Sequence, residues 1–293
     1  MSKTVYKQYD SKTLKKLQNV LVEIMNDVIA VCDRHNIPCF LVYGTAIGAA
    51  RHAGFIPWDD DIDLGMLRED YNHFLEIFEK ELSDKYELLT PLTDNRYACT
   101  VTHVQKRGTV FITEGNQDLQ CNRSIFIDIF PFDRLPDDQM CQKKIVRKSK
   151  ILAKLLFLSG TGNPVIPFDG IVYHILHFAC EIVHFCLNVF HIKPATLYQK
   201  FVSTATQYNC QEYEYVTSYE DNQCLKCKVK IDDLFPLKKV KFEDTEAYVP
   251  NNNETYLNQI YGNFMEIPPV EKRVNHAPIK IDFGDNTIEA KQS

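Results

Sequence analysis

Residues 43–65 read YGTAIGAARHAGFIPWDDDIDLG, and this stretch predicts the fold around it. An apolar run, residues 39–43, stops at Gly44-Thr45, which is typical of a buried strand that enters a tight turn. A helix over residues 46–52 is expected next, followed by a loop and a second strand. A turn that feeds a helix N-terminus presents backbone N–H groups and a positive dipole end to a phosphate.

The second strand, expected over residues 61–66, carries Asp61 and Asp63. Alternate residues of a strand point to the same face, so these carboxylates share a face about 7 Å apart. Two ionised carboxylates at this spacing repel each other unless they are solvated or bridged by a cation. Mg²⁺, or Mn²⁺ in its place, suits such ligands because it leaves coordination positions for substrate phosphates. A third carboxylate, Asp128, lies in an otherwise apolar strand expected over residues 124–130.

Outward from this stretch, the chain alternates between helical and strand patterns. Apolar residues at helical spacing predict amphipathic helices over residues 12–35 and 71–82 and a short helix over residues 255–261. Alternating, β-branched residues predict one or two strands within residues 97–113. The expected fold is therefore α/β (α+β): a mixed sheet with flanking helices in one domain, residues 1–293, with a helical insertion at about residues 140–210.

The expected insertion is unlike the rest of the chain. Residues 143–154 hold six basic residues among apolar ones, and residues 171–192 form an apolar helix with one narrow polar stripe. Burial of the apolar helix against the catalytic part is the first expectation. Peripheral contact with the interface of a membrane, helped by the basic helix, is the second. Spanning the bilayer is disfavoured because four His, one Glu and one Asn lie within the helix.

The composition of the 293 residues restricts the class of protein. A formal net charge of −6 argues against a general nucleic-acid binder. The first ten residues, MSKTVYKQYD, contain no apolar run, so no secretory signal peptide is expected and a cytoplasmic location is predicted. Ten cysteines scattered through a long chain favour free thiols. Cys224 and Cys227 have the spacing of half a zinc site, but no second CxxC pair exists to complete one.

The stretch at 43–65 also resembles the signature of the LicD family, within the nucleotidyltransferase superfamily; fukutin-related proteins are similar. The resemblance continues through FIDIFPFDRLP (126–136), VPNNNETYLNQIYGNFMEIPP (249–269) and RVNHAP (273–278). It implies a polymerase β-like nucleotidyltransferase fold in which Asp61, Asp63 and Asp128 bind metal and act in catalysis. It further implies transfer of phosphocholine from CDP-choline to a cell-surface glycan, such as a lipopolysaccharide, teichoic acid or capsule precursor, with release of CMP.

Three alternatives stay open. The enzyme could carry ribitol phosphate or glycerol phosphate from another CDP-activated alcohol. It could be a true nucleotidyltransferase that releases pyrophosphate. A non-catalytic protein that binds a glycan or a membrane is the third reading, and the intact carboxylates argue against it. The expected partners are therefore a CDP-alcohol donor and a glycan or lipid-linked glycan acceptor.

Further residues near these motifs are expected to bind the substrate. Gly44 and Thr45 would bind phosphate through the turn. The cationic side chains expected at the donor phosphates, with His276 as a further contact, are Arg51, Lys106, Arg107 and Arg273. Asp128 is expected to take the proton of the acceptor hydroxyl. A quaternary ammonium would need an aromatic face, for which the sequence offers Phe55, Trp58, Tyr97 and Phe130.

Overall fold

The fold is that of a computed structural model, which describes residues 9–117 and 119–284. Residues 1–8, and with them most of the segment in which no signal peptide is expected, lie outside the described residues. The helices are α1 (Ser11–Arg34), α2 (Tyr43–His52), α3 (Arg68–Glu81), α4 (Gln139–Gly160), α5 (Gly170–Val189), α6 (Pro194–Ala205), α7 (Ile231–Leu234) and α8 (Asn253–Tyr261). The strands are β1 (Phe40–Leu41), β2 (Asp63–Leu67), β3 (Tyr86–Leu89), β4 (Thr102–Lys106), β5 (Val110–Ile112), β6 (Phe126–Leu135), β7 (Tyr215–Thr217), β8 (Val229–Lys230), β9 (Lys238–Phe242), β10 (Thr245–Val249) and β11 (Lys280–Asp282).

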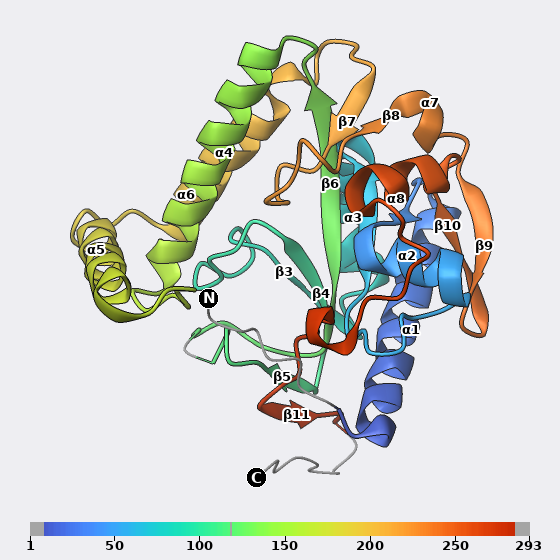
Figure 1. The fold of residues 1–293 in the computed structure, drawn as a ribbon, viewed down its shortest axis with the longest axis horizontal. Coiled ribbons are helices and arrows are strands. Elements are labelled where there is room, and N and C mark those ends of the chain that lie inside the picture. Colours follow the sequence, from blue (N-terminus) through green and yellow to red (C-terminus); the bar gives the residue numbers. More distant parts are fainter. Residues whose placement is uncertain (1–8, 118, 285–293) are drawn as a thin grey trace.

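A mixed seven-stranded sheet forms the centre of the molecule, as Figure 1 shows. Its strand order is β1-β2-β6-β4-β3. The C-terminal end of β6 also pairs with β7, which in turn pairs with β8. Only the β2–β6 pair is parallel among these pairings of described strands. The predicted α/β fold with a mixed sheet is therefore confirmed.

Helix α1 illustrates how the sequence pattern becomes packing. The side chain of Asp10 accepts a hydrogen bond from the Thr13 backbone N–H at 3.0 Å and caps the helix. The helix then buries a stripe that includes Leu17, Leu21 and Val28 in the main core. Full burial of each such side chain is worth about 2 kcal/mol, so this face holds α1 on the sheet.

Two predicted elements differ from the observed ones in a way that matters for the site. The strand expected to begin at Asp61 begins at Asp63, so Asp61 lies in the irregular segment that leads into β2. The helix expected to begin at residue 46 begins at Tyr43, which places Gly44 and Thr45 within its first turn. Tyr43 itself has a left-handed backbone, with φ of 50°, an unfavourable conformation for a bulky residue that stores strain beside the acidic residues.

A buried ion triad joins β6 to the segment that follows β7. Arg68 donates to both carboxyl oxygens of Asp133, at 2.9 and 2.6 Å, and lies 3.4 Å from Glu220. The carboxylates of Asp133 and Glu220 are fully buried. Burial is the main cause that raises the pKa of Glu220, to about 7, although Arg68 opposes it.

Helices α4, α5 and α6 follow β6 and precede β7 in the chain. They form an arm that extends away from the sheet in Figure 1. Ile145 and Val146 of α4 pack with Phe201 and Ala205 of α6. The arm covers residues 139–205, close to the predicted limits of 140–210.

The expectation that the apolar helix is buried is wrong. Leu187 is the only residue of α5 that is buried among those the structure describes. The helix packs through one mixed side, where Leu187 joins an apolar cluster with Leu156 and Leu197 and where His184 bonds to the carbonyl of Leu158 on α4. Its broad apolar face is exposed. It is also the one described helix that is long and apolar enough to cross a membrane by length and composition.

Candidate functional site

The parallel pairing of β2 with β6 creates the central feature of the site. Asp63 is the register partner of Asp128, so the two carboxylates start from directly adjacent positions on neighbouring strands. Adjacent strands lie about 4.8 Å apart, which is close for two like charges. Burial, together with the charges of Asp61, Asp128 and Asp59, raises the pKa of Asp63 well above its usual value.

The segment before β2 brings two more carboxylates to the same place. Burial, and then the charges of Asp61 and Asp60, raises the pKa of Asp59 well above its usual value. Asp59 also lies against the start of α2, because a Cβ added to Gly44 would stand 3.3 Å from Asp59 Oδ2. Glycine at this position thus lets the acidic segment approach the helix N-terminus closely.

Asp60 has a structural role within this segment. Its carboxyl oxygens accept the backbone N–H of His276 at 2.9 and 2.8 Å, and Oδ2 also accepts the Tyr9 hydroxyl at 2.6 Å. The Asp60 side chain is fully buried. It therefore ties the C-terminal segment and Tyr9, which precedes the N-cap of α1, to the site, and its oxygens are already satisfied.

His276 places a positive charge beside the acidic residues. Its Nδ1 lies 3.4 Å from Asp61 Oδ2 and 3.5 Å from Asp60 Oδ1. These two carboxylates raise the pKa of His276 to about 11, so the imidazole is protonated at neutral pH. Its side chain is 62% exposed, so solvent screening weakens each of these ion pairs.

His103 is a neighbour of Asp128 that sequence reasoning missed. Its Nε2 lies 3.0 Å from Asp128 Oδ1, and its ring stacks on Phe126 with centroids 3.9 Å apart. Tyr97 contacts the same ring by its edge at 5.1 Å. Two aromatic rings thus fix the imidazole against the carboxylate. The pairing of His103 with Asp128 across β4 and β6 is a matter of strand register, which no local sequence signal gives.

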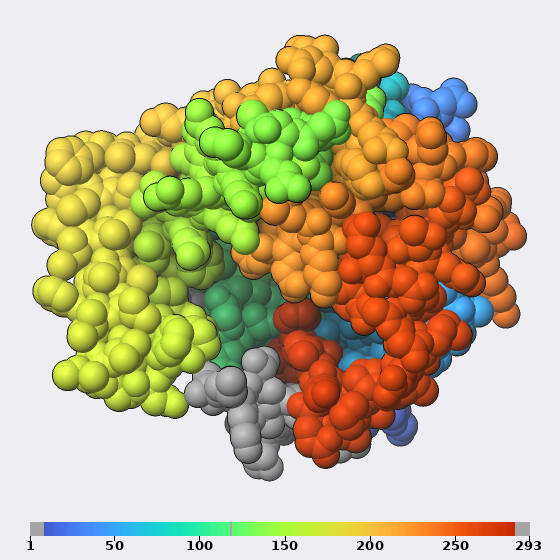
Figure 2. Space-filling view, turned by 45° about the horizontal axis from the view of Figure 1, so that its top comes forward, coloured from blue at the N-terminus to red at the C-terminus, as the bar shows by residue number. Residues whose placement is uncertain are grey.

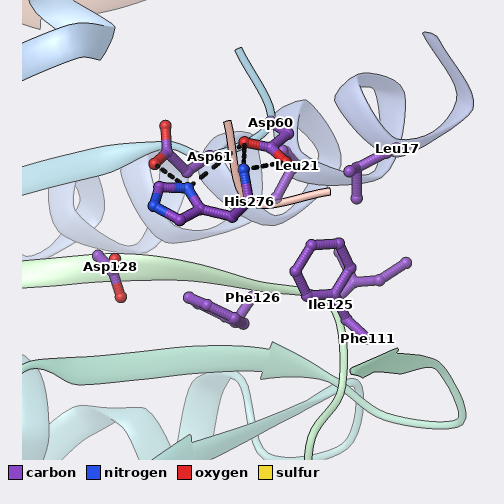
Figure 3. A pocket seen from close by; sticks show the side chains of 9 residues that line it. All are labelled: Leu17, Leu21, Asp60, Asp61, Phe111, Ile125, Phe126, Asp128 and His276. Atoms are coloured by element: carbon purple, nitrogen blue, oxygen red, sulfur yellow. Dashed lines mark hydrogen bonds and ion pairs between the residues drawn. The ribbon is translucent and has the colours of Figure 1, made fainter. Parts of the chain in front are cut away.

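A pocket of about 100 Å³ opens beside these groups (Figure 3). One part of its lining is acidic and the other is apolar. In Figure 3 the His276 imidazole lies between Asp61 and Asp128, and the apolar side chains lie farther along β6 and α1. The full lining consists of Leu17, Leu21, Asp60, Asp61, Phe111, Ile125, Phe126, Asp128 and His276.

The two residues of the predicted phosphate turn, Gly44 and Thr45, lie in the first turn of α2. Thr45 is buried, and its hydroxyl accepts the Asp63 backbone N–H at 2.9 Å. This bond fixes where β2 starts and thereby where Asp63 points. Gly44 remains beside Asp59 in the first turn of α2, where backbone N–H groups have no partners within the helix.

Two of the four predicted phosphate-binding cations lie near the site, and both already have partners. Arg273 lies over the ring of Trp58, with 4.1 Å between Cζ and the ring centroid. Arg51 donates to the backbone carbonyl of Phe264 at 2.8 Å and so holds the C-terminal segment against α2. Either side chain would have to exchange these contacts for those with a phosphate.

The structure does not bring the other two cations to the pocket. Lys106 forms an ion pair with Glu23 of α1 at 2.6 Å. Arg107 donates to the backbone carbonyl of Ser83 at 2.9 Å, beyond the end of α3. Neither residue lines the pocket, so their role as donor contacts has no geometric support among the described residues.

The aromatic residues that line the pocket are not the four expected from sequence. Trp58 is covered by Arg273, and Phe55 packs on Phe242. Phe130 and Tyr97 pack against Tyr43 and His103 respectively. Phe111 and Phe126 supply the aromatic wall instead, and they meet because β5 and β6 converge at this point of the fold.

The two cysteines with half-zinc spacing are poor ligands where they lie. Cys224 and Cys227 are both buried. Burial raises the pKa of Cys224 to about 11 and raises that of Cys227 further. Zinc binds the thiolate form, so burial opposes binding at this pair.

The acidic cluster, by contrast, has the chemistry of a divalent-cation site. Carboxylate oxygens are the ligands that Mg²⁺ prefers, and crowding of Asp61, Asp63 and Asp128 is relieved when a cation is shared between them. One buried oxygen, Asp128 Oδ1, receives no hydrogen bond of good geometry although His103 is near. An unsatisfied buried carboxylate oxygen of this kind is suited to metal ligation.

A mixed sheet with a cluster of carboxylates at adjacent strands is consistent with a nucleotidyltransferase domain, and comparison with known sequences finds the same class of domain. The family model for the LicD/FKTN/FKRP nucleotidyltransferase domain matches residues 36–154, which include β1, α2, β2, β4 and β6 with all three predicted metal ligands. Over these residues the chain is similar to the LicD/FKTN/FKRP family.

Curated relatives give the same result. The chain is similar to the lipopolysaccharide cholinephosphotransferase LicD of Haemophilus influenzae, with 26% identity over 275 residues that cover 90% of this chain and 96% of the relative. Shorter similarities reach an uncharacterized protein of Rickettsia typhi, 38% identical over 77 residues, and one of Rickettsia prowazekii, 40% identical over 57 residues. These two alignments cover 26% and 20% of this chain and 24% and 21% of the relatives.

Proposed function

We propose that this protein, a phosphotransferase of the LicD family, transfers phosphocholine from CDP-choline to a hydroxyl of a cell-surface glycan and releases CMP. The observation that carries the proposal is the pairing of Asp63 with Asp128 across parallel strands, with Asp61 beside them. The similarity to the Haemophilus influenzae cholinephosphotransferase supports the choice of phosphocholine and of a lipopolysaccharide-type acceptor. A cytoplasmic location, where CDP-choline would be available, is part of the same proposal.

The proposed roles follow from position. Asp61, Asp63 and Asp128 would hold Mg²⁺, or Mn²⁺ in its place, which when bound neutralises phosphate charge during the displacement. Gly44 and the first turn of α2 would bind a donor phosphate through backbone N–H groups. The protonated His276 adds a positive charge at the same edge of the pocket.

The displacement itself needs one proton acceptor. The acceptor hydroxyl forms a bond to the phosphorus that carries choline, the bond from that phosphorus to the bridging oxygen breaks, and CMP departs with the bridging oxygen. Asp128 would accept the hydroxyl proton, and His103, which lies 3.0 Å from Asp128 and packs against Phe126 and Tyr97, would hold this carboxylate in orientation.

The apolar part of the pocket favours choline among the CDP-activated alcohols. A trimethylammonium group is stabilised by aromatic faces, which Phe111 and Phe126 provide. Ribitol and glycerol would leave hydroxyl groups against the apolar lining without hydrogen-bond partners, which is unfavourable.

The test is donor turnover with Mg²⁺. Purified protein is incubated with CDP-choline, CDP-ribitol, CDP-glycerol or CTP and a membrane extract that supplies the acceptor, and CMP and pyrophosphate are quantified. CMP released from CDP-choline, lost in Asp61→Asn and retained in the matched variant Asp137→Asn on an exposed turn, is the expected result. CMP from another CDP-alcohol would change the cargo, and pyrophosphate from CTP would contradict the proposed leaving group.

A further inference from the structure

The exposed face of α5 is the feature of this chain that catalysis leaves unexplained. A single stripe at spacings of four and three residues carries Ile171, Ile175, Phe178, Ile182, Phe185 and Val189. Each of these side chains is between 47% and 76% exposed. Water-soluble proteins seldom expose a contiguous set of large apolar side chains of this extent unless it contacts a partner.

The opposite side of the same helix packs on the rest of the arm through apolar and polar groups together. Leu187 is buried in a cluster with Leu156 and Leu197. His184 donates from Nδ1 to the backbone carbonyl of Leu158 at 2.7 Å and accepts from Asn188 Nδ2 at 2.9 Å. His177 bonds to Asn163 Oδ1 at 2.8 Å. Surface helices of soluble domains normally bury their broad apolar face, whereas in α5 most of the large apolar side chains are exposed. These hydrogen bonds anchor α5 so that its apolar face is presented outward.

The charge of the arm points to the kind of partner. Residues 139–205 contain eight lysines and arginines but only two acids, Asp169 and Glu181, which gives a net charge of +6. The whole chain carries −6, so the remaining residues carry −12. A positively charged arm on an otherwise acidic protein is complementary to an anionic surface and would turn the acidic remainder away from it.

The path of the chain shows how α5 would meet such a surface. The chain enters α5 from α4 and leaves it into α6, and these two helices pack on each other. Both ends of α5 therefore lead back to the same body, and a helix that crossed a bilayer would separate them. The arm holds α5 at its outer end in Figure 1, and Figure 2 shows that end as the outermost region on one side of the molecule.

We propose that the outward apolar face of α5 lies in the plane of a membrane, in the interface of a bilayer that contains anionic lipids. The apolar stripe enters the boundary between headgroups and acyl chains, and the cations of α4 and α6 contact the lipid headgroups. If the acceptor glycan is lipid-linked, a point that depends on the proposed function, this attachment holds the pocket at the surface where that acceptor lies.

Vesicle binding of the full chain tests the proposal without using catalysis. Sedimentation with phosphatidylcholine vesicles, with and without phosphatidylglycerol, is compared for the natural protein and for Phe178→Ser/Phe185→Ser. Both phenylalanines are exposed, so their loss is not expected to unfold the protein, and circular dichroism checks this. The matched control is Leu92→Ser/Leu225→Ser, which removes two exposed leucines elsewhere.

We expect binding to phosphatidylglycerol vesicles that weakens at high salt and falls by at least about tenfold in the phenylalanine variant, with the leucine control unchanged. Equal binding of both variants, or no sedimentation with either vesicle, would overturn the proposal. A concentration-dependent dimer in light scattering, lost in the phenylalanine variant, would assign the face to a second copy of the chain and would also overturn it. Failure of donor turnover would contradict the proposed function and leave these vesicle results unaffected.

Discussion

The four aspartates of residues 59–63 differ in whether their carboxylates are satisfied by hydrogen bonds or crowded by like charges. Asp60 is fully hydrogen-bonded and structural, whereas Asp59, Asp61 and Asp63 crowd together beside Asp128. The five residues 59–63, DDDID, thus contain one structural carboxylate and three carboxylates that crowd together. The division follows from the direction in which each carboxylate leaves the backbone.

Asp63→Asn tests whether Asp63 contributes to a cation site. Because it removes one of several repelling buried carboxylates, we expect the variant to be more stable than the natural protein without metal, by about 1 kcal/mol. We also expect it to lose most of the rise in melting temperature on adding Mg²⁺ and to lose phosphotransfer. Thermal unfolding with EDTA or with Mg²⁺ measures both effects. An equal Mg²⁺-dependent shift in Asp63→Asn and the natural protein would show that the cation binds elsewhere.

His103 offers a second test, because its proposed role is to position Asp128. We expect His103→Phe to lower kcat by about 10- to 100-fold with little change in the KM of the donor. His103→Gln, which keeps an N–H donor, is expected to retain more of kcat. Initial rates of CMP release measure the difference, with His73→Gln on α3 as the control. A changed KM with unchanged kcat would instead indicate that His103 contacts the donor.

Among the elements, helix α2 packs closely against the loop that follows it, at Gly48 and Gly54. A Cβ added to Gly48 would stand 2.4 Å from the carbonyl oxygen of Gly54, a backbone atom that cannot move without shifting the loop. We expect Gly48→Ala to lower the free energy of unfolding by about 2 kcal/mol and to reduce activity, because the acidic segment follows this loop. Denaturant unfolding checks the first effect. Gly115→Ala, which meets only Thr113 Oγ1 at 3.9 Å, is expected to be neutral.

The buried triad that links β6 to the segment after β7 predicts a pH dependence. The pKa of Glu220 is raised by burial to about 7, so the folded state holds a proton that the unfolded state releases near pH 4.3. The stability that this proton gives is complete below about pH 4.3 and is lost as the pH rises through about 7. In Glu220→Gln, this loss, on the order of 3 kcal/mol, should be absent.

Urea unfolding at several pH values between acid and neutral measures this difference. Glu212→Gln, at an exposed position a few residues earlier, is the control and should keep the pH dependence of the natural protein. Parallel stability curves for Glu220→Gln and the natural protein would mean that Glu220 is ionised throughout this range.

For the whole molecule, the arm separates attachment from chemistry. We expect Phe178→Ser/Phe185→Ser to release CMP from CDP-choline at the normal rate with a small soluble acceptor glycan. With the acceptor in membranes, the rate should fall by about tenfold, because the enzyme is no longer concentrated at the surface. Parallel assays with the two acceptors measure the ratio. A similar loss with both acceptors would mean that α5 supports the fold of the pocket.

Local patterns predicted much of this architecture. The expected helix over residues 12–35 is α1, the strand around Asp128 is β6, and the basic helix is α4. Periodicity predicts such elements because burial of one face is a local requirement of each helix or strand. The predicted metal ligands Asp61, Asp63 and Asp128 could be chosen for the same reason, since a carboxylate in an apolar strand or next to another carboxylate is visible in the sequence itself.

Tertiary structure alone decided which groups meet. Strand register placed Asp63 beside Asp128 and brought His103 to the same carboxylate. Lys106 forms an ion pair with Glu23 and so lies away from the pocket. The choice of Phe111 and Phe126 for the pocket wall, and of the side with His184 and Leu187 as the packed side of α5, arose in the same way. Sequence determines which face of an element is apolar through local periodicity, but which surface meets that face depends on contacts between residues far apart in the chain.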